Sequence, residues 1–348
     1  MRVPSSEPPE EICAPAQEIQ PWRAVSTAGH GWRRVLGGLG GLVLGAVLLV
    51  AAWAKALDPG AFAAQIEREG LDFVLPAAAV ALAALAIETF LGVALVLGVR
   101  RPFVLWPAAG LVVFFLFLTG RTWWQDAHGT LPADAAGCGC FGNLVERTPA
   151  EAFWQDLLLL VPALLLAFAG RSREQLWRLE PSPPRYRLGF AAALTAAVLV
   201  LAWKAPELPL DDLATRLKPG VATQALCAGS AADGKQVCLG DIVPELAAGE
   251  HVVVLADLDE AFGASVEQLN AYYWAGGDPA LWVVSAASEQ ERFAFRFGFG
   301  PAFEVREAPP ALLRPLYRTL PRSFLVRAGK VVETHGGLPP LERWRETP

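Results

Sequence analysis

The sequence predicts an α-helical membrane protein that carries a water-soluble α/β domain in its C-terminal part. The chain has 348 residues, of which 53% are hydrophobic, a high share for a soluble protein. Long apolar runs are confined to residues 35–205, and residues 206–348 have the composition of a soluble domain. The excess acidic charge belongs to this second part, which has 13 basic and 19 acidic residues. No basic face indicates binding to nucleic acid.

Five stretches are long and apolar enough to be membrane spans, because a helix needs roughly 20 apolar residues to cross the hydrocarbon core. They are residues 35–54, 75–99, 102–120, 152–169 and 188–205. We expect the first four to form a four-helix unit over residues 33–170. The first span, "VLGGLGGLVLGAVLL", is rich in glycine. We interpret these glycines as positions where another helix approaches closely.

The basic residues predict the orientation of the spans, because loops on the cytoplasmic side are enriched in Arg and Lys. Eleven of them lie in the N-terminal tail and in the connections after spans two and four, and the two opposite loops hold four. Residues 1–32 then form a disordered cytoplasmic tail and 171–187 a cytoplasmic linker. Residues 188–205 are the fifth span. The loop after the third span and residues 206–348 lie outside, which in a bacterial inner membrane means the oxidising periplasm.

The outer loop contains Cys138 and Cys140, separated by one glycine. A disulfide between them would close a very small, strained ring, and a strained disulfide oxidises other thiols. Three interpretations remain open: a redox pair that exchanges with a partner dithiol, a metal site with His128 as third ligand, or a structural loop. Cys13, in the cytoplasmic tail, is predicted to be a free thiol.

Three motifs carry a resemblance to a known family. "WAKALDP", "ALAIETFLGVALVLG" and "CGCFGN" are similar to sequences of the methylamine-utilisation MauE family, a branch of the DoxX-like four-helix membrane proteins. The resemblance covers about residues 33–170. It implies an integral membrane protein linked to methylamine metabolism and to maturation of the disulfide-rich small subunit of methylamine dehydrogenase, although a family is wider than one pathway. The positions carried over are Lys55, Asp58, Glu88, Cys138, Cys140, Phe141 and Gly142.

Glu88 lies in the middle of an apolar span, where an ionised carboxylate is costly and is usually neutral, paired or functional. In one interpretation Lys55 extends to the outer interface and Glu88 forms a hydrogen bond between helices. In the other, Glu88 accepts a proton near a membrane quinone, because oxidation of a dithiol releases two protons and two electrons.

The C-terminal part resembles thioredoxin-like proteins of the TlpA and peroxiredoxin kind. "DGKQVCLGDIVPEL" is similar to their opening, and strands are expected at residues 250–258 and 279–286, with a helix at 262–276 between them. Residues 320–337 resemble the closing hairpin, with Leu320–Pro321 as the cis proline and a turn at 328–330. One departure is clear: "DLDEAFGASVEQ" has no cysteine where a catalytic thioredoxin carries CxxC.

Cys227 and Cys238 flank a turn and could lie opposite each other in a hairpin. They are interpreted either as a disulfide that clamps the hairpin or as a shuttle dithiol that exchanges with Cys138 and Cys140.

These observations predict periplasmic thiol–disulfide chemistry that supports maturation of a secreted redox enzyme, with a membrane quinone as possible electron acceptor and no metal. The expected partners are membrane lipid and a periplasmic client protein. A non-enzymatic scaffold that holds a client through the acidic domain is an alternative. An accessory subunit of a quinone-linked oxidase, of the DoxX type, is another. It would need a haem-bearing partner, because the spans contain no paired histidines.

Overall fold

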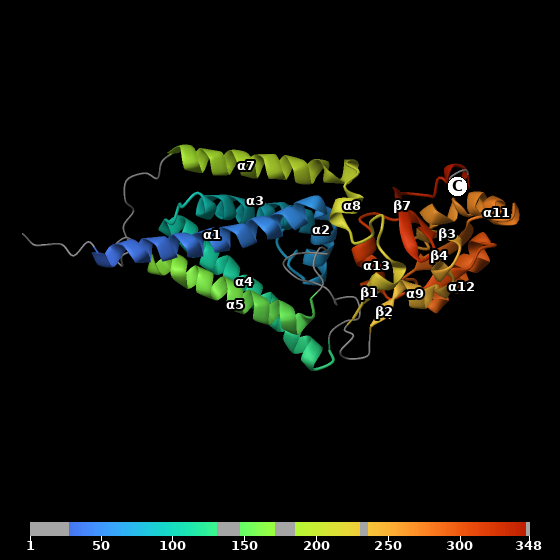
Figure 1. Cartoon of the computed structure of the whole chain (residues 1–348), viewed down its shortest axis with the longest axis horizontal. Coiled ribbons are helices and arrows are strands. Elements are labelled where there is room, and N and C mark those ends of the chain that lie inside the picture. Colours follow the sequence, from blue (N-terminus) through green and yellow to red (C-terminus); the bar gives the residue numbers. More distant parts are fainter. Residues whose placement is uncertain (1–27, 131–146, 171–184, 230–235, 346–348) are drawn as a thin grey trace, which may run out of the picture.

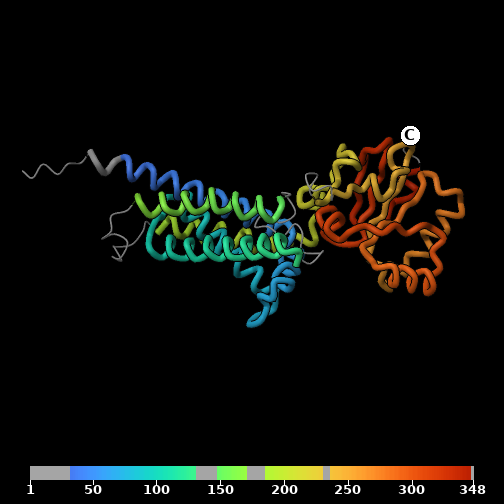
Figure 2. The backbone as a smooth tube through the Cα atoms, turned by 90° about the horizontal axis from the view of Figure 1, so that it is seen from below, coloured from blue at the N-terminus to red at the C-terminus, as the bar shows by residue number. Residues whose placement is uncertain are grey.

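The computed structural model describes residues 28–130, 147–170, 185–229 and 236–345. These residues form two units that lie end to end, a bundle of long helices and an α/β domain (Figures 1 and 2). The loop with Cys138, Cys140, Phe141 and Gly142, and the tail with Cys13, lie outside the described residues.

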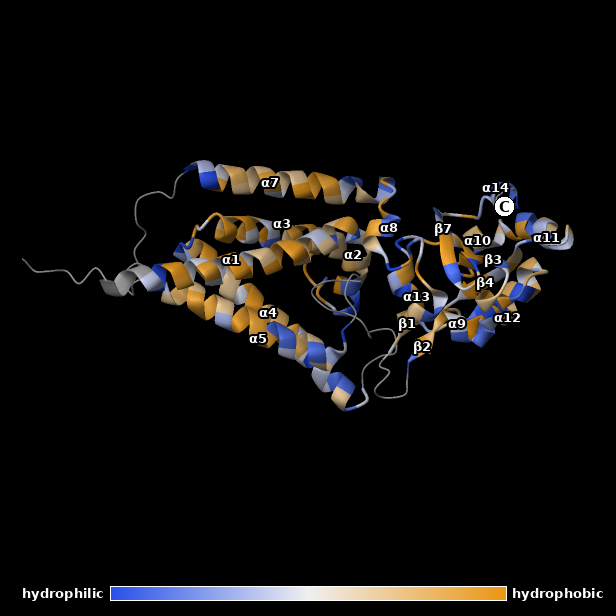
Figure 3. Cartoon of the chain, viewed as in Figure 1, coloured by the Kyte–Doolittle hydropathy of each residue, from blue (hydrophilic) through white to orange (hydrophobic). Residues whose placement is uncertain are grey.

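Five described helices are long and apolar enough to cross a membrane. They are α1 (Ala28–Leu57), α3 (Ala77–Val96), α4 (Pro102–Ala127), α5 (Pro149–Ala169) and α7 (Arg185–Lys204). Each overlaps one expected span. The largest differences are in α1, which begins at Ala28 and not at residue 35, and in α4, which continues past residue 120 through "RTWWQDA". Hydropathy falls in these stretches while the helices continue. Figure 3 shows that hydrophobic residues dominate these helices.

The bundle core is formed by α1, α3, α4 and α5, with α1 in contact with both α3 and α5. Helix α7 lies along α3 and also contacts α1. Large apolar side chains such as Trp106, Phe117 and Leu158 are at least half exposed on the outer faces of the bundle. An exposed apolar surface of this kind is expected where helices face lipid rather than water.

Glycines of α1 allow two close helix contacts. A Cβ at Gly45 would lie 2.7 Å from the Gly92 carbonyl oxygen of α3, and one at Gly40 would lie 2.5 Å from the Ala163 oxygen of α5. Such distances exclude any side chain at these positions. Gly38, in contrast, has open space around it. The packing interpretation of the glycine-rich span is therefore confirmed at Gly40 and Gly45, and Gly38 is an exception.

A short helix that the hydropathy pattern did not predict follows α1. This helix, α2 (Pro59–Arg68), lies at the end of the bundle nearest the C-terminal domain (Figures 1 and 2). Its start has a clear local cause: Asp58 caps the helix by accepting a hydrogen bond from the Ala61 amide, and Pro59 occupies the first turn. Ile66 buries its side chain against Ala77 and Ala81 of α3.

The C-terminal domain is built on a five-stranded mixed sheet with the order β5-β4-β3-β6-β7. Strand β3 (Glu250–Leu255) is parallel to β4 (Ala280–Ser285), which is parallel to β5 (Val305–Glu307). Strand β6 (Arg322–Arg327) is antiparallel to β3 and to β7 (Lys330–Gly336). A separate hairpin pairs β1 (Cys227–Ala228) with β2 (Val237–Cys238).

Hydrophobic side chains cover both faces of the sheet, because alternate residues of a strand point to opposite sides. Val252 and Val254 of β3 belong to one buried cluster, and Val253 and Leu255 belong to the other. The helices of the domain are α8 (Asp211–Ala214), α9 (Leu239–Ile242), α10 (Glu260–Gly263), α11 (Val266–Trp274), α12 (Glu289–Phe299), α13 (Pro310–Leu313) and α14 (Leu341–Arg345). Short 3-10 turns are η2 (Ala205–Glu207), η3 (Thr223–Ala225), η5 (Pro244–Ala247) and η6 (Arg314–Leu316).

Most of the expected elements of this domain are present. The closing hairpin turns at Ala328 and Gly329, which both have positive φ, and the Leu320–Pro321 bond is cis. The helix expected at residues 262–276 is divided into α10 and α11. Helix α12 and strand β5 were not predicted, because α12 has an almost wholly exposed surface and β5 is only three residues long.

Candidate functional site

A buried ion pair joins two helices of the bundle. Lys55, in the last turn of α1, places its Nζ 2.5 Å from Oε1 of Glu88, near the middle of α3. Lys55 is 7% exposed and Glu88 is 1% exposed. The ammonium group of Lys55 is buried inside the bundle, where Glu88 supplies the opposite charge, and the depth of Lys55 in a membrane stays a prediction. The hydrogen bond between helices that was expected of Glu88 is the one to Lys55.

The surroundings of this pair are apolar, apart from a few polar atoms. The Lys55 ammonium lies 4.8 Å from the ring centre of Phe62 in α2 and 5.0 Å from that of Phe115 in α4. Such cation–π contacts stabilise a cation that has left water. One carboxylate oxygen of the pair, Oε2 of Glu88, is buried and has no hydrogen-bond partner within the described part of the chain. The site thus combines one donor group with an acceptor oxygen that can bind a proton or a donor.

The crossing of α1 and α3 positions this pair. Gly92 lies one turn beyond Glu88 on α3 and meets Gly45 of α1, which lets the two backbones approach. The small residues Ala52 and Ala56 of α1 pack against Leu85 of α3 on either side of the level of Lys55. Because α1 and α3 lie close together here, the long side chain of Lys55 on α1 reaches the carboxylate of Glu88 on α3.

Asp58 has a different role from Lys55 and Glu88. One carboxylate oxygen caps α2, and Oδ2 is buried without a hydrogen-bond partner among the described residues. Burial raises the pKa of Asp58; nearby Arg318 opposes this rise and Asp211 adds to it. Both of these residues belong to the C-terminal domain, and α2, which Asp58 caps, contacts the 3-10 turn η2 at the start of that domain.

Sequence reasoning missed a second buried ion pair. Arg147 places Nη1 3.2 Å from Oδ1 of Asp156 in α5, and the two side chains are 9% and 5% exposed. Arg147 is the first described residue after the cysteine loop, and Thr148 and Glu151 then form a reciprocal cap at the start of α5. The available signal was an aspartate inside an apolar span with an arginine just before it, a combination that often indicates pairing in a membrane.

His128 ends the long helix α4 on the other side of the cysteine loop. Its ring lies 4.0 Å from that of Trp124, and its Nδ1 is 2.7 Å from the Trp124 carbonyl oxygen. Among the described residues, no group of three or more His, Cys, Asp or Glu could hold a metal ion. The metal interpretation depends on Cys138 and Cys140 and so lies outside the described residues.

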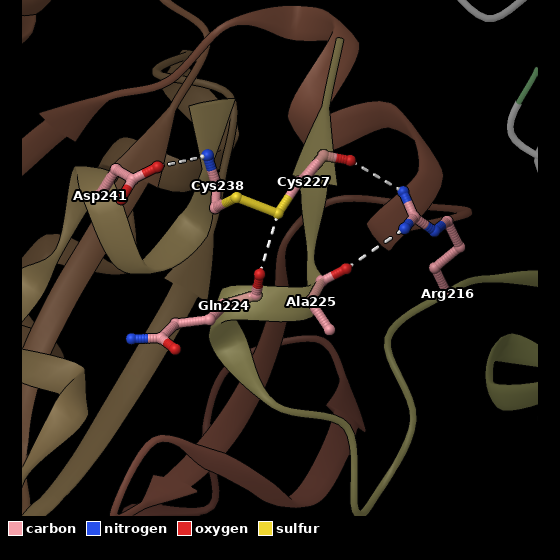
Figure 4. Close-up of a disulfide and its surroundings, with 6 residues drawn as sticks. All are labelled: Arg216, Gln224, Ala225, Cys227, Cys238 and Asp241. Atoms are coloured by element: carbon pink, nitrogen blue, oxygen red, sulfur yellow. Dashed lines mark hydrogen bonds between the residues drawn. A yellow bond between two sulfur atoms is a disulfide. The ribbon is translucent and has the colours of Figure 1, made fainter. Parts of the chain in front are cut away.

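Cys227 and Cys238 lie directly opposite each other in the β1–β2 hairpin, with their sulfur atoms at disulfide distance (Figure 4). Arg216 donates hydrogen bonds to the carbonyl oxygens of Cys227 and Ala225, and Asp241 accepts one from the Cys238 amide (Figure 4). These bonds tie both strands to neighbouring segments. The geometry allows a clamp, and whether the pair also exchanges with other thiols stays a prediction.

The segment after β3 carries acidic residues and no cysteine. Asp257 follows β3, and Asp259 caps α10 by accepting a hydrogen bond from the Phe262 amide. Burial raises the pKa of Asp257, as do the charges of Asp259 and Glu291. Burial, together with the charge of Asp257, raises the pKa of Tyr317 to about 12, and Arg68 at the end of α2 opposes that shift.

Comparison with known proteins supports the bundle as the unit that can be related to a family. Comparison with curated proteins and with solved structures gave no match. A family match covers the described helices α1 to α5 together with the cysteine loop, and ends before the fifth apolar helix. Residues 33–169 of this chain match the family described as methylamine utilisation protein MauE.

Proposed function

We propose that this chain is a MauE-like membrane protein that carries out thiol–disulfide exchange outside the cytoplasm, in support of the maturation of a secreted redox enzyme of the methylamine-utilisation type. The match of residues 33–169 carries the proposal, because it includes both the CGC loop and the Lys55–Glu88 pair. The N-terminal tail and the connections after spans two and four are rich in Arg, which supports a cytoplasmic location for them and an outside location for the CGC loop.

In the proposed reaction, two client thiols become a disulfide while the Cys138–Cys140 disulfide becomes two thiols. Thiolate attack on one sulfur forms a mixed disulfide, and the second client thiol resolves it. The reduced pair is then oxidised again and passes two electrons and two protons to a membrane quinone, the acceptor class that we propose. Each cycle therefore converts one client dithiol and one quinone into one disulfide and one quinol.

Lys55 and Glu88 are the residues that we assign to proton handling in the second half of this cycle. The Glu88 carboxylate has one oxygen on Lys55 and a second, unpartnered oxygen among the described residues, so it can accept a proton. Lys55 compensates the charge when Glu88 is ionised. Ionisable residues inside membrane helices usually pair with one another, and some of them form proton relays.

We further propose that residues 206–348 form a thioredoxin-like domain that lacks the catalytic cysteines. The strand order, the cis proline and the closing hairpin support this interpretation. With Asp257 and Asp259 after β3 in place of thiols, the role left for this domain is to hold a partner rather than to react with it.

The test uses the full chain in intact cells and a membrane-impermeant thiol reagent, applied before and after reduction. We expect Cys138 and Cys140 to be labelled only after reduction, and Cys13 not at all, since it lies on the cytoplasmic side. A variant with both Cys138→Ser and Cys140→Ser should accumulate reduced client, whereas Cys13→Ser should not. Labelling of Cys138 and Cys140 without prior reduction would contradict the redox proposal.

A second candidate is a non-enzymatic assembly factor. One observation favours it: the two described cysteines lie at disulfide distance in a hairpin, and the position after β3 has none. In this case the variant without Cys138 and Cys140 would still support client maturation, and removal of residues 206–348 would abolish it.

A further inference from the structure

Arginines gather at the end of the bundle that lies away from the C-terminal domain (Figure 1). At this end α1 and α7 begin, α5 ends, and a short connection joins α3 to α4. The arginines here are Arg33, Arg34, Arg100, Arg101, Arg185 and Arg187. No Asp or Glu occurs in the described residues of these segments, which are 32–41, 96–103, 166–170 and 185–190. Within the described part of the chain, this end of the bundle is therefore strongly positive.

Arg100, in the connection between α3 and α4, lies against the backbones of two other helices. Its Cδ is 3.4 Å from the place that a Cβ would take at Gly41 of α1. Its Nη1 lies where a Cβ at Gly37 of α1, or at Gly170 at the end of α5, would clash with it. These glycines therefore leave the space that the arginine side chain fills, and they fix the position of its guanidinium group.

The buried part of this guanidinium has no anion beside it. Nη1 of Arg100 is buried and has no hydrogen-bond partner among the described residues. Burial lowers the pKa of Arg100, as expected for a cation that has lost water without gaining a counter-charge. The orientation of membrane helices accounts for many arginines in one set of connections. It does not account for a guanidinium that is withdrawn from water, which is costly unless an acceptor binds it.

Two further elements bring positive charge to the same connection. Arg187 of α7 donates from Nη1 to the carbonyl oxygen of Leu97, at 3.1 Å. Helix α4 begins directly after Arg101, and no side chain caps its N-terminus. The N-terminus of a long helix carries a partial positive charge and exposes backbone N–H groups, which together favour an anion. The connection, α7 and α4 thus converge on one positive site.

We propose that this site binds the phosphate of an anionic phospholipid headgroup through Arg100, Arg187 and the N-terminus of α4. A guanidinium presents its N–H groups in a planar fork that fits two phosphate oxygens. Lipid headgroups lie at the ends of membrane-spanning helices, and basic pockets between such helices bind them. The site therefore meets lipid phosphates at a far higher local concentration than dissolved phosphate. The proposal does not depend on the thiol chemistry or on the side of the membrane that this end faces.

The test is native mass spectrometry of the full chain in maltoside micelles, with phosphatidylglycerol or phosphatidylcholine added. We expect the native chain to retain phosphatidylglycerol in preference to phosphatidylcholine. Arg100→Gln should lower the affinity for phosphatidylglycerol about tenfold, the effect of losing one hydrogen bond to a charged group. Arg187→Gln should lower it in the same direction. Arg121→Gln removes the same charge from an exposed ion pair at the other end of α4, so this matched control should leave the affinity unchanged.

Four results would overturn the proposal. The native chain could bind both lipids equally. A folded Arg100→Gln chain could keep its full affinity, and Arg187→Gln takes over this decision when circular dichroism shows that Arg100→Gln does not fold. Equal losses in Arg100→Gln and Arg121→Gln would mean that the lipid responds to net charge and not to this site. Complete displacement of the lipid by millimolar inorganic phosphate would assign the site to dissolved phosphate instead.

Discussion

Removing one partner of the Lys55–Glu88 pair should destabilise the membrane unit more than removing both. At the observed Nζ–Oε1 distance of 2.5 Å, two unit charges attract by about 7 kcal/mol for an effective dielectric constant of about 20. Transfer of both ions out of water costs several kcal/mol each, so the intact pair contributes little net stability. Either single variant leaves one charge buried without compensation, at a cost of about 3–5 kcal/mol.

The perturbations are Lys55→Met and Glu88→Met, alone and together, because methionine is long, unbranched and apolar. We expect each single variant to lose about 3–5 kcal/mol of unfolding free energy, and the double variant to lie within about 1 kcal/mol of the native chain or above it. Equilibrium unfolding of the full chain in mixed micelles, followed by tryptophan fluorescence, measures the three differences. Glu67→Met, at an exposed glutamate of α2, is the control and should change little.

The reasoning would be refuted if the two single losses simply added in the double variant. Additive losses would mean that the residues act through their own packing and not through each other. A small loss in Glu88→Met alone would also refute it, because Lys55 would then have a second route to solvent or to another anion.

Further changes test other parts of the structure. Gly45→Ala should lower the free energy of unfolding by about 1–3 kcal/mol, because its Cβ would meet the Gly92 backbone. Gly38→Ala should leave the stability unchanged or slightly higher, because Gly38 has open space around it. Thermal unfolding in micelles measures both variants, and equal effects would contradict the packing argument. Replacing Cys227 and Cys238 together by Ser should cost about 2–3 kcal/mol if they clamp the hairpin, and unaltered thiol exchange in that variant would exclude the shuttle. Burial raises the pKa of Asp257 above 3.8, and the charges of Asp259 and Glu291 add to this rise. The folded state therefore binds a proton at Asp257 more tightly than the unfolded state does. The ionised form of Asp257 then lowers the stability of the fold at neutral pH. Asp257→Asn should therefore be more stable than the native chain at pH 7, and the difference should shrink as the pH falls through the raised pKa toward 3.8; a difference that stays constant with pH would refute the assignment.

Local patterns gave the membrane helices and most strands of the C-terminal domain. Each of the five apolar stretches lies within a long helix, apart from a few residues at its ends, and the strand expected at residues 250–258 contains β3. Hydropathy is summed along a short stretch, so it can be read without knowing which segments meet. Helix α2 was not predicted from hydropathy, because it is short and contains both polar and apolar residues. Asp58–Pro59 is nevertheless a helix-start signal that is visible in the sequence.

The candidate site was predicted in its residue types but not in its contacts. Lys55 and Glu88 were singled out from the sequence, and only the structure showed that they pair with each other. The pair of Arg147 and Asp156 was missed altogether. Cys138 and Cys140 remain known from the sequence alone, since they lie outside the described residues.

The sequence by itself determined that this chain has five apolar helices, an α/β domain without a cysteine after its first central strand, and one glycine-flanked cysteine pair. The tertiary structure decided which charges meet: Lys55 with Glu88 across α1 and α3, and Arg147 with Asp156 at the start of α5. The physical reason is that burial of apolar residues depends on local composition, whereas the partner of a buried charge depends on where backbones cross. Those crossings are set by glycines such as Gly45 and Gly92, whose partners lie far away in the sequence.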